Sequence, residues 1–224
     1  MKKNSMYGTV IETKKESDGT IVHNLNTGEI LKYQAVRGGI CWPLKDRKPY
    51  YCIIGEQWTP THAFTEERKR GKLVMFAEGE QSITKFVKFL TELTDSIKLY
   101  RCDELYTSMH DEYRDYIRAF SDYQQERGMT EGRLDYAPYM DNFALGLSVI
   151  QEWVIMGMID LPEGSIVRAQ LRAIDASKLV ETPEKTYHAI NGLRYVLAGY
   201  QKYPPFQNRT HEPVQHQPGF AWMA

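Results

Sequence analysis

The pattern of apolar and polar positions begins with three short segments that are rich in β-branched residues and tyrosine, at residues 7–15, 20–25 and 29–36. Asp18-Gly19 and Asn26-Thr27-Gly28 separate them, and such dipeptides and tripeptides between strand-like runs are typical of hairpins. Arg37-Gly38-Gly39 and Trp42-Pro43 then break the pattern. The sequence therefore predicts a small N-terminal β-meander over residues 1–46.

The pattern changes after this point. Residues 49–57 form a near-continuous apolar run that includes a glycine, as expected of a strand buried on both faces, and residues 72–77 form a second run. Ser82 can cap a helix whose apolar positions recur at helical spacing, at Ile83, Phe86, Val87, Phe89, Leu90 and Leu93. Residues 97–102 read as a further strand. This order of strand, hairpin, strand, helix and strand favours an α/β sheet with a helical crossover.

The C-terminal half is predicted to be mainly helical. Helices are expected over 106–127, 141–159 and 182–201, with a loop at 129–139, while 165–174 fits either a strand or a helix. The residues after Pro204 are rich in Pro, Gln and His without periodicity. We therefore predict an α/β domain over 47–203 and a tail over 204–224 that is extended and docked, or disordered.

Length and composition bear on the number of domains and on the cellular compartment. The 224 residues suit one domain, or one domain with a small attachment, and a net charge of −1 gives no overall positive field for nucleic acid. No apolar run approaches the ~20 residues needed to cross a bilayer, and no apolar run follows the two N-terminal lysines. Three widely spaced cysteines fit a reducing compartment. We expect a cytoplasmic protein without a membrane partner.

Two acidic residues stand where a sheet can present metal ligands. Glu56 follows a buried run and a glycine, and Asp103, with Glu104 beside it, follows the run at 97–102. If the two strands are neighbours, these carboxylates can face each other and bind Mg²⁺ or Mn²⁺, ions that prefer oxygen ligands and assist phosphodiester hydrolysis. The alternative is that both acids are ordinary caps or solvated turn residues, which are common at strand ends.

A charged hairpin at residues 66–72 is the candidate nucleic-acid contact. It carries four cations, and such side chains bind phosphate backbones; they are Arg68, Lys69, Arg70 and Lys72. The alternative is a solvated hairpin tip, since charge runs at tips are usually hydrated. His188, near the start of the last predicted helix, is by itself more typical of a packed or capping histidine than of a ligand. No phosphate-binding glycine loop is present, so this sequence carries no packaging motor of its own.

The C-terminal part resembles a known family. Met158-Ile159-Asp160-Leu161-Pro162, then Ala169-Gln170-Leu171, then the helix segment from Tyr187 to Leu197 is similar to the end of the nuclease domain of phage large terminases. Gly55-Glu56 resembles the end of that domain's first strand, and Asp103 its second acid. The resemblance covers about residues 48–200.

The resemblance implies a ribonuclease H-like mixed sheet with flanking helices, a metal-dependent nuclease acting on DNA, and a role in DNA packaging. Glu56 and Asp103 would hold the metal, and His188 would assist. The sequence departs from the family at Glu56, where aspartate is usual, and in the last helix, where the acids fall on Tyr187 or His188 and on Asn191. A chain with these replacements is either a divergent nuclease or a non-catalytic protein that binds nucleic acid or a viral assembly partner.

Overall fold

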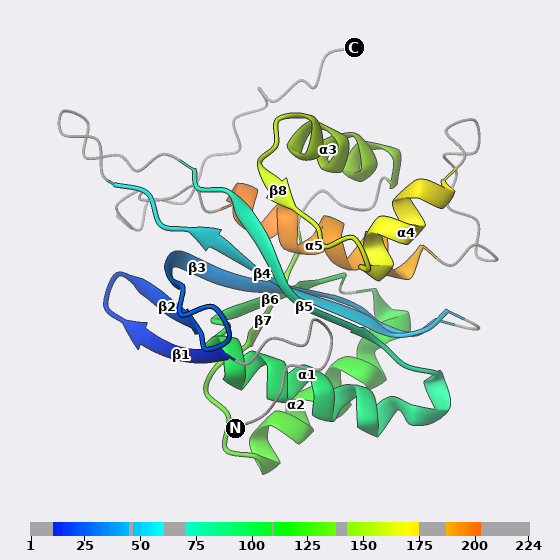
Figure 1. Cartoon of the computed structure of the whole chain (residues 1–224). Coiled ribbons are helices and arrows are strands. Elements are labelled where there is room, and N and C mark those ends of the chain that lie inside the picture. Colours follow the sequence, from blue (N-terminus) through cyan, green and yellow to red (C-terminus); the bar gives the residue numbers. More distant parts are fainter. Residues whose placement is uncertain are drawn as a thin grey trace, which may run out of the picture.

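The computed structural model describes residues 11–44, 47–60, 70–108, 110–137, 143–174 and 187–202. Its strands form one eight-stranded mixed sheet with helices on both faces (Figure 1). The strands are β1 (Ile11–Glu16), β2 (Gly19–Asn24), β3 (Ile30–Cys41), β4 (Tyr50–Gln57), β5 (Leu73–Glu80), β6 (Glu104–Thr107), β7 (Arg133–Tyr136) and β8 (Ile159–Asp160). The helices are α1 (Phe86–Tyr100), α2 (Arg114–Glu126), α3 (Phe143–Ile155), α4 (Ile166–Ala173) and α5 (His188–Lys202), with short 3-10 turns at Ile83–Lys85 and Asp111–Tyr113.

Five strands form the centre of the sheet in the order β5-β4-β3-β6-β7. β3, β4 and β5 are antiparallel neighbours, whereas β6 runs parallel to β3 and β7 parallel to β6. α1 connects β5 to β6, and α2 connects β6 to β7. An antiparallel hairpin triplet followed by two parallel strands reached through helices is the ribonuclease H-like arrangement, so the predicted fold class is confirmed.

The remaining strands extend this centre at its margins. β2 pairs with residues 30–33 of β3, and β6 pairs with residues 37–40 of the same strand. β1 pairs with β2 to complete the predicted antiparallel meander, and the two-residue β8 pairs in parallel with β5.

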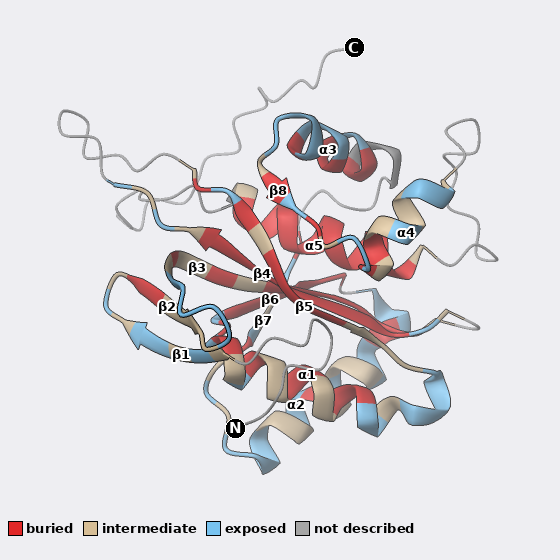
Figure 2. Cartoon of the chain, viewed as in Figure 1, coloured by how far each residue is buried: buried red, intermediate tan, exposed pale blue. Residues whose placement is uncertain are grey.

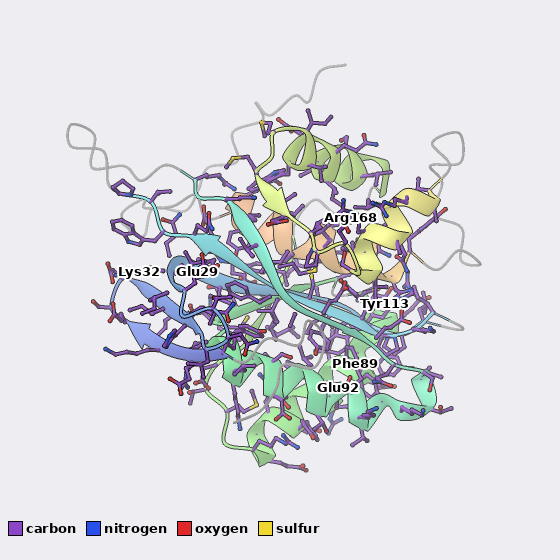
Figure 3. All side chains as sticks on the ribbon, in the orientation of Figure 1. Glu29, Lys32, Phe89, Glu92, Tyr113 and Arg168 are labelled. Atoms are coloured by element: carbon purple, nitrogen blue, oxygen red, sulfur yellow. The ribbon has the colours of Figure 1, made fainter. Side chains whose placement is uncertain are left out.

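The sheet separates two apolar layers (Figure 2). Cys52 and Ile54 of β4 point to the layer under α3, α4 and α5, whereas Tyr51 and Ile53 point to the layer over α1 and α2. Alternate side chains of a strand point to opposite faces, so a strand covered on both faces needs apolar residues at every position. The interior position predicted for this run is confirmed. Figure 3 shows side chains filling both layers, with Phe89 of α1 in the lower one.

Some local predictions differ from the structure, and the one that the sequence left open is decided by it. The sequence predicts a strand over residues 97–102, but α1 continues to Tyr100 and ends where Arg101 adopts a left-handed backbone with φ of 54°. The apolar residues Ile97 and Tyr100 there belong to the helix face that packs on the sheet. The expected loop at 129–139 contains β7, a four-residue edge strand too short for a clear pattern. Residues 166–173 are helical, and Ser165 caps this helix by accepting the N–H of Arg168.

The predicted boundary near residue 46 remains a prediction about domain organisation. Hydrogen bonding is continuous across this position, because β3 pairs with β4 along residues 33–41. Residues 29–36, expected as the last strand of a meander, begin a strand that continues to Cys41 at the centre of the sheet. The tail at 204–224 lies outside the described residues. No helix among the described residues is long and apolar enough to cross a membrane.

Candidate functional site

Glu56 lies near the end of β4 with only 2% of its surface exposed. Its Oε1 accepts a hydrogen bond from the backbone N–H of Gly71 at 3.2 Å. Burial raises the pKa of Glu56 because the ionised form is desolvated, and the positive charges of Arg70 and Arg37 act in the opposite direction. Glu56 is therefore a buried carboxylate with two guanidinium groups nearby.

Arg70 is directed into the protein. One of its terminal nitrogens donates to the backbone oxygen of Tyr200 at 2.7 Å, near the C-terminal end of α5, where helix carbonyls lack partners. Its guanidinium lies 5.3 Å from the ring centroid of Trp153. Burial lowers the pKa of Arg70, and the charge of Glu56 opposes that shift. The guanidinium of Arg70 therefore makes its contacts with other parts of the protein.

Asp103 directly precedes β6 and is half exposed. Its Oδ2 is 2.5 Å from Nζ of Lys15, which is also partly exposed, and this pair joins β1 to the beginning of β6. The backbone N–H of Asp103 donates to the backbone oxygen of Val36 at 3.1 Å. The carboxylate is thus paired with a lysine, and both side chains are partly exposed to solvent.

The structure does not bring Glu56 and Asp103 into one group. β3 lies between β4 and β6, with Ala35 opposite Glu56 and Arg37 opposite Glu104. In the ranges that the structure describes, no cluster of three or more His, Cys, Asp or Glu side chains can hold a metal ion. Two guanidinium groups beside one acid and a lysine on the other repel a divalent cation. These residues do not fit a magnesium or manganese ion shared by Glu56 and Asp103.

His188 is the first residue of α5 and is 5% exposed. Its Nε2 is 2.5 Å from Oε2 of Glu80 at the end of β5, and the amide nitrogen of Gln170 lies 3.2 Å from its Nδ1. Sequence segments that resemble the terminase domain, Ala169-Gln170-Leu171 and the last helix, therefore meet at this histidine. Both ring nitrogens have partners within the protein.

A network of charges centres on Glu104, the acid that directly follows Asp103 in the sequence. Glu104, 7% exposed, accepts from Nε of Arg37 at 3.3 Å, from Arg133 at 2.8 Å and from the hydroxyl of Tyr106 at 2.8 Å. The guanidinium of Arg37 lies 4.8 Å from the ring of Tyr200. Arg37 stands beside two glycines, a pattern that indicates the end of a strand and conceals its position in the centre of β3.

The sheet has a topological switch point between β3 and β6. These strands are parallel neighbours, but the chain continues from β3 towards β4 on one side and from β6 towards β7 on the other. In open α/β sheets, ligands bind beyond the carboxyl ends of strands at such a point. The described side chains at these two strand ends are Cys41, Thr107 and Ser108, and none of the three is a carboxylate. Thr107 donates to the backbone oxygen of Ile40 at 2.9 Å, and the buried hydroxyl of Ser108 has no hydrogen-bond partner among the described residues.

The predicted basic hairpin falls only partly within the described residues. Arg68 and Lys69 lie outside them. Lys72 is 45% exposed, and its Nζ is 3.6 Å from Oδ2 of Asp160. Among the described members of this group, Lys72 is the cation that reaches solvent, because Arg70 is directed towards Tyr200.

Comparisons with known proteins include a distant likeness to a solved structure. No protein-family profile matches the chain, and no curated protein matches it. Among solved structures, the Holliday junction resolvase of fowlpox virus matches with a TM-score of 0.42 and 13% sequence identity. The match covers 75% of this chain and 98% of the resolvase chain.

Proposed function

We propose that this chain is a nuclease-fold protein that binds DNA and does not cut it through Glu56 and Asp103. The observation that carries the proposal is the state of these two carboxylates. Glu56 is buried close to Arg70 and Arg37, while Asp103 is paired with Lys15. A shared divalent ion needs at least two carboxylates directed at one point.

The switch point between β3 and β6 supports the same proposal. A catalytic metal site there needs oxygen ligands with negative charge, because Mg²⁺ and Mn²⁺ prefer carboxylates. Cys41 provides a buried thiol, and sulfur is a soft ligand that these hard cations do not favour. Thr107 and Ser108 provide neutral hydroxyls. The sheet has the strand order of a nuclease fold, but these three described positions lack the negative charge that metal-dependent cleavage needs.

DNA as the ligand is supported by the fold and by the sequence. The strand order is that of a nuclease fold, and residues 158–197 resemble the end of a terminase nuclease domain. Arg68, Lys69 and Lys72 provide a local group of cations in a chain without net positive charge. The resemblance also implies viral packaging or assembly proteins as partners, and fold likeness alone does not choose between these roles.

The test is binding of a fluorescently labelled DNA duplex, followed by fluorescence anisotropy at several salt concentrations. The double variant Arg68→Ala and Lys69→Ala should weaken binding at every sequence tested. It should also reduce the dependence of log K on log salt by about one unit for each phosphate group that the variant no longer binds. Binding should not require magnesium or manganese.

A matched control separates a local effect from a change in net charge. Lys85→Ala with Lys88→Ala removes the same charge from the start of α1, which lies on the opposite face of the sheet from α5 (Figure 1). This control variant should bind DNA as the wild type does. No binding by the wild type, or equal weakening in both double variants, would contradict the proposed DNA contact.

A further inference from the structure

The start of α5 is held by side chains from two other elements. The side-chain oxygen of Gln170 on α4 accepts the backbone N–H groups of Ala189 and Ile190 at 3.1 and 3.4 Å. These N–H groups belong to the first turn of α5, where a helix has no internal acceptors. Gln170 therefore replaces the capping side chain that α5 would otherwise need.

This cap fixes the orientation of the Gln170 amide. Because Oε1 faces two N–H donors, Nε2 has to face the other way, towards His188. Nε2 lies 3.2 Å from Nδ1 of His188 and 3.4 Å from its Nε2. An amide nitrogen only donates, so its ring partner has to accept.

The other side of the His188 ring meets an ionised acid. Burial acts to raise the pKa of Glu80, but hydrogen bonds from Lys48 and His188 outweigh it, so the pKa lies below its ordinary value. The carboxylate therefore accepts from His188 Nε2 at 2.5 Å and from Lys48 Nζ at 2.7 Å. Nε2 of His188 has to carry a proton, which leaves Nδ1 as the acceptor for Gln170.

We propose that Gln170, His188 and Glu80 form an acid-sensitive latch that joins α4 and β5 to the start of α5, with His188 held as the neutral Nε2–H tautomer. A second proton on Nδ1 places an N–H group against the amide N–H groups of Gln170. The repulsion between these N–H groups is relieved only when the Gln170 amide rotates. This rotation takes Oε1 away from the backbone N–H groups of Ala189 and Ile190. The latch is closed while the His188 ring is neutral and opens when acid adds the second proton to Nδ1.

Some charges around the His188 ring favour the uptake of a second proton, and others oppose it. Glu80 attracts a proton to His188, whereas Lys48 and the positive N-terminal end of α5 repel it. Tyr50 of β4, whose ring centroid is 6.0 Å from that of His188, packs against the ring and donates its own hydroxyl proton to Glu78. On α5 itself, Asn191 and Arg194 are hydrogen-bonded to each other. The Gln170 amide is thus the donor that opposes a protonated ring.

Nuclear magnetic resonance on the full chain tests the latch at two points. Long-range nitrogen–proton correlations of His188 should show the Nε2–H tautomer at neutral pH. On acidification, hydrogen exchange of the Ala189 and Ile190 amides, corrected for the intrinsic effect of pH, should speed up together with protonation of His188. Amides in the middle of α5, such as those of Val196 and Leu197, should not respond.

The variant Gln170→Glu makes the test discriminating. A carboxylate of the same shape still accepts from Ala189 and Ile190, but it also accepts from a protonated Nδ1. Acidification should therefore leave the first turn of α5 protected in this variant. An Nδ1–H tautomer in the wild type at neutral pH would overturn the proposal, and so would an equal acid response in Gln170→Glu and the wild type.

Discussion

Gly39 of β3 and Gly192 of α5 lie in direct contact through their backbones. A Cβ atom built on Gly39 would collide with the carbonyl oxygen of Gly192, and one built on Gly192 would collide with the ring of Tyr50. Helix α5 can cross the centre of the sheet at this depth because neither residue has a side chain. This contact places the start of α5 beside Glu80 and its end beside Arg70.

The first prediction concerns this crossing. Gly39→Ala should lower the free energy of unfolding by about 3 kcal/mol, the upper end of the usual cost of overpacking, because the colliding atoms are backbone and cannot rotate away. Urea unfolding of the purified variant gives the value. Gly164→Ala is the control, since a Cβ there meets nothing within 4 Å. A Gly39→Ala protein as stable as the control would contradict the close approach.

The second prediction concerns the interior strand. Ile53→Asp should prevent soluble folding, because Ile53 has no exposed surface and an unpaired buried charge is costly. The measurement is soluble yield followed by a thermal melt. Val87→Asp makes the same chemical change at a residue that is 68% exposed and should melt like the wild type. A soluble, cooperatively melting Ile53→Asp protein would refute the interior placement.

The third prediction concerns the pH dependence contributed by Glu56. The pKa of this residue is raised in the folded state, so the folded protein holds the proton more tightly than the unfolded chain. Stability contributed by the protonated form is complete below about pH 4.3, the ordinary value for glutamate, and falls as the pH rises to the folded-state pKa. Glu56→Gln cannot titrate and should lack this component.

Urea unfolding of both proteins across a series of pH values measures that difference. The stability of Glu56→Gln relative to the wild type should improve as the pH rises above the ordinary value. A difference that stays constant with pH would contradict the buried, desolvated carboxylate. Any constant offset measures the effect on Arg70 and Arg37 of removing their acidic neighbour.

The fourth prediction concerns Asp103 and Lys15. This partly exposed pair should contribute less than about 1 kcal/mol, as is usual for surface ion pairs. A double-mutant cycle of Asp103→Asn and Lys15→Gln isolates the interaction, and high salt should reduce it further. A coupling energy of several kcal/mol would show that Asp103 belongs to a more strongly organised site.

Much of the sheet can be predicted from the sequence, and the reasons are local. The run at residues 50–57 is buried along nearly its whole length, as its apolar pattern predicts, and the hairpin signals at Gly19 and Gly28 coincide with the β1–β2 and β2–β3 turns. The pattern predicts too short a β3 because two glycines normally end a strand, whereas here Gly39 admits α5 and Gly38 lies against Leu105 and Ile53. The pattern of side chains in a single strand does not record which helix crosses it.

The candidate site is less predictable for a related reason. Placing Glu56 and Asp103 together assumes that their strands are neighbours, but β3 lies between them. The long-range contacts of Arg70 with Tyr200, and of His188 with Glu80, join residues more than 100 positions apart. No spacing rule along the chain predicts such contacts.

A nicking assay on supercoiled plasmid with manganese tests whether Glu56 and Asp103 support DNA cleavage, at protein concentrations that visibly retard the plasmid in a gel. The full chain is compared with Glu56→Gln and Asp103→Asn, two changes that keep shape and remove charge. The wild type should retard the plasmid without cutting it, because neither carboxylate is arranged to share a metal ion. Manganese-dependent nicking by the wild type that either variant abolishes would contradict this prediction.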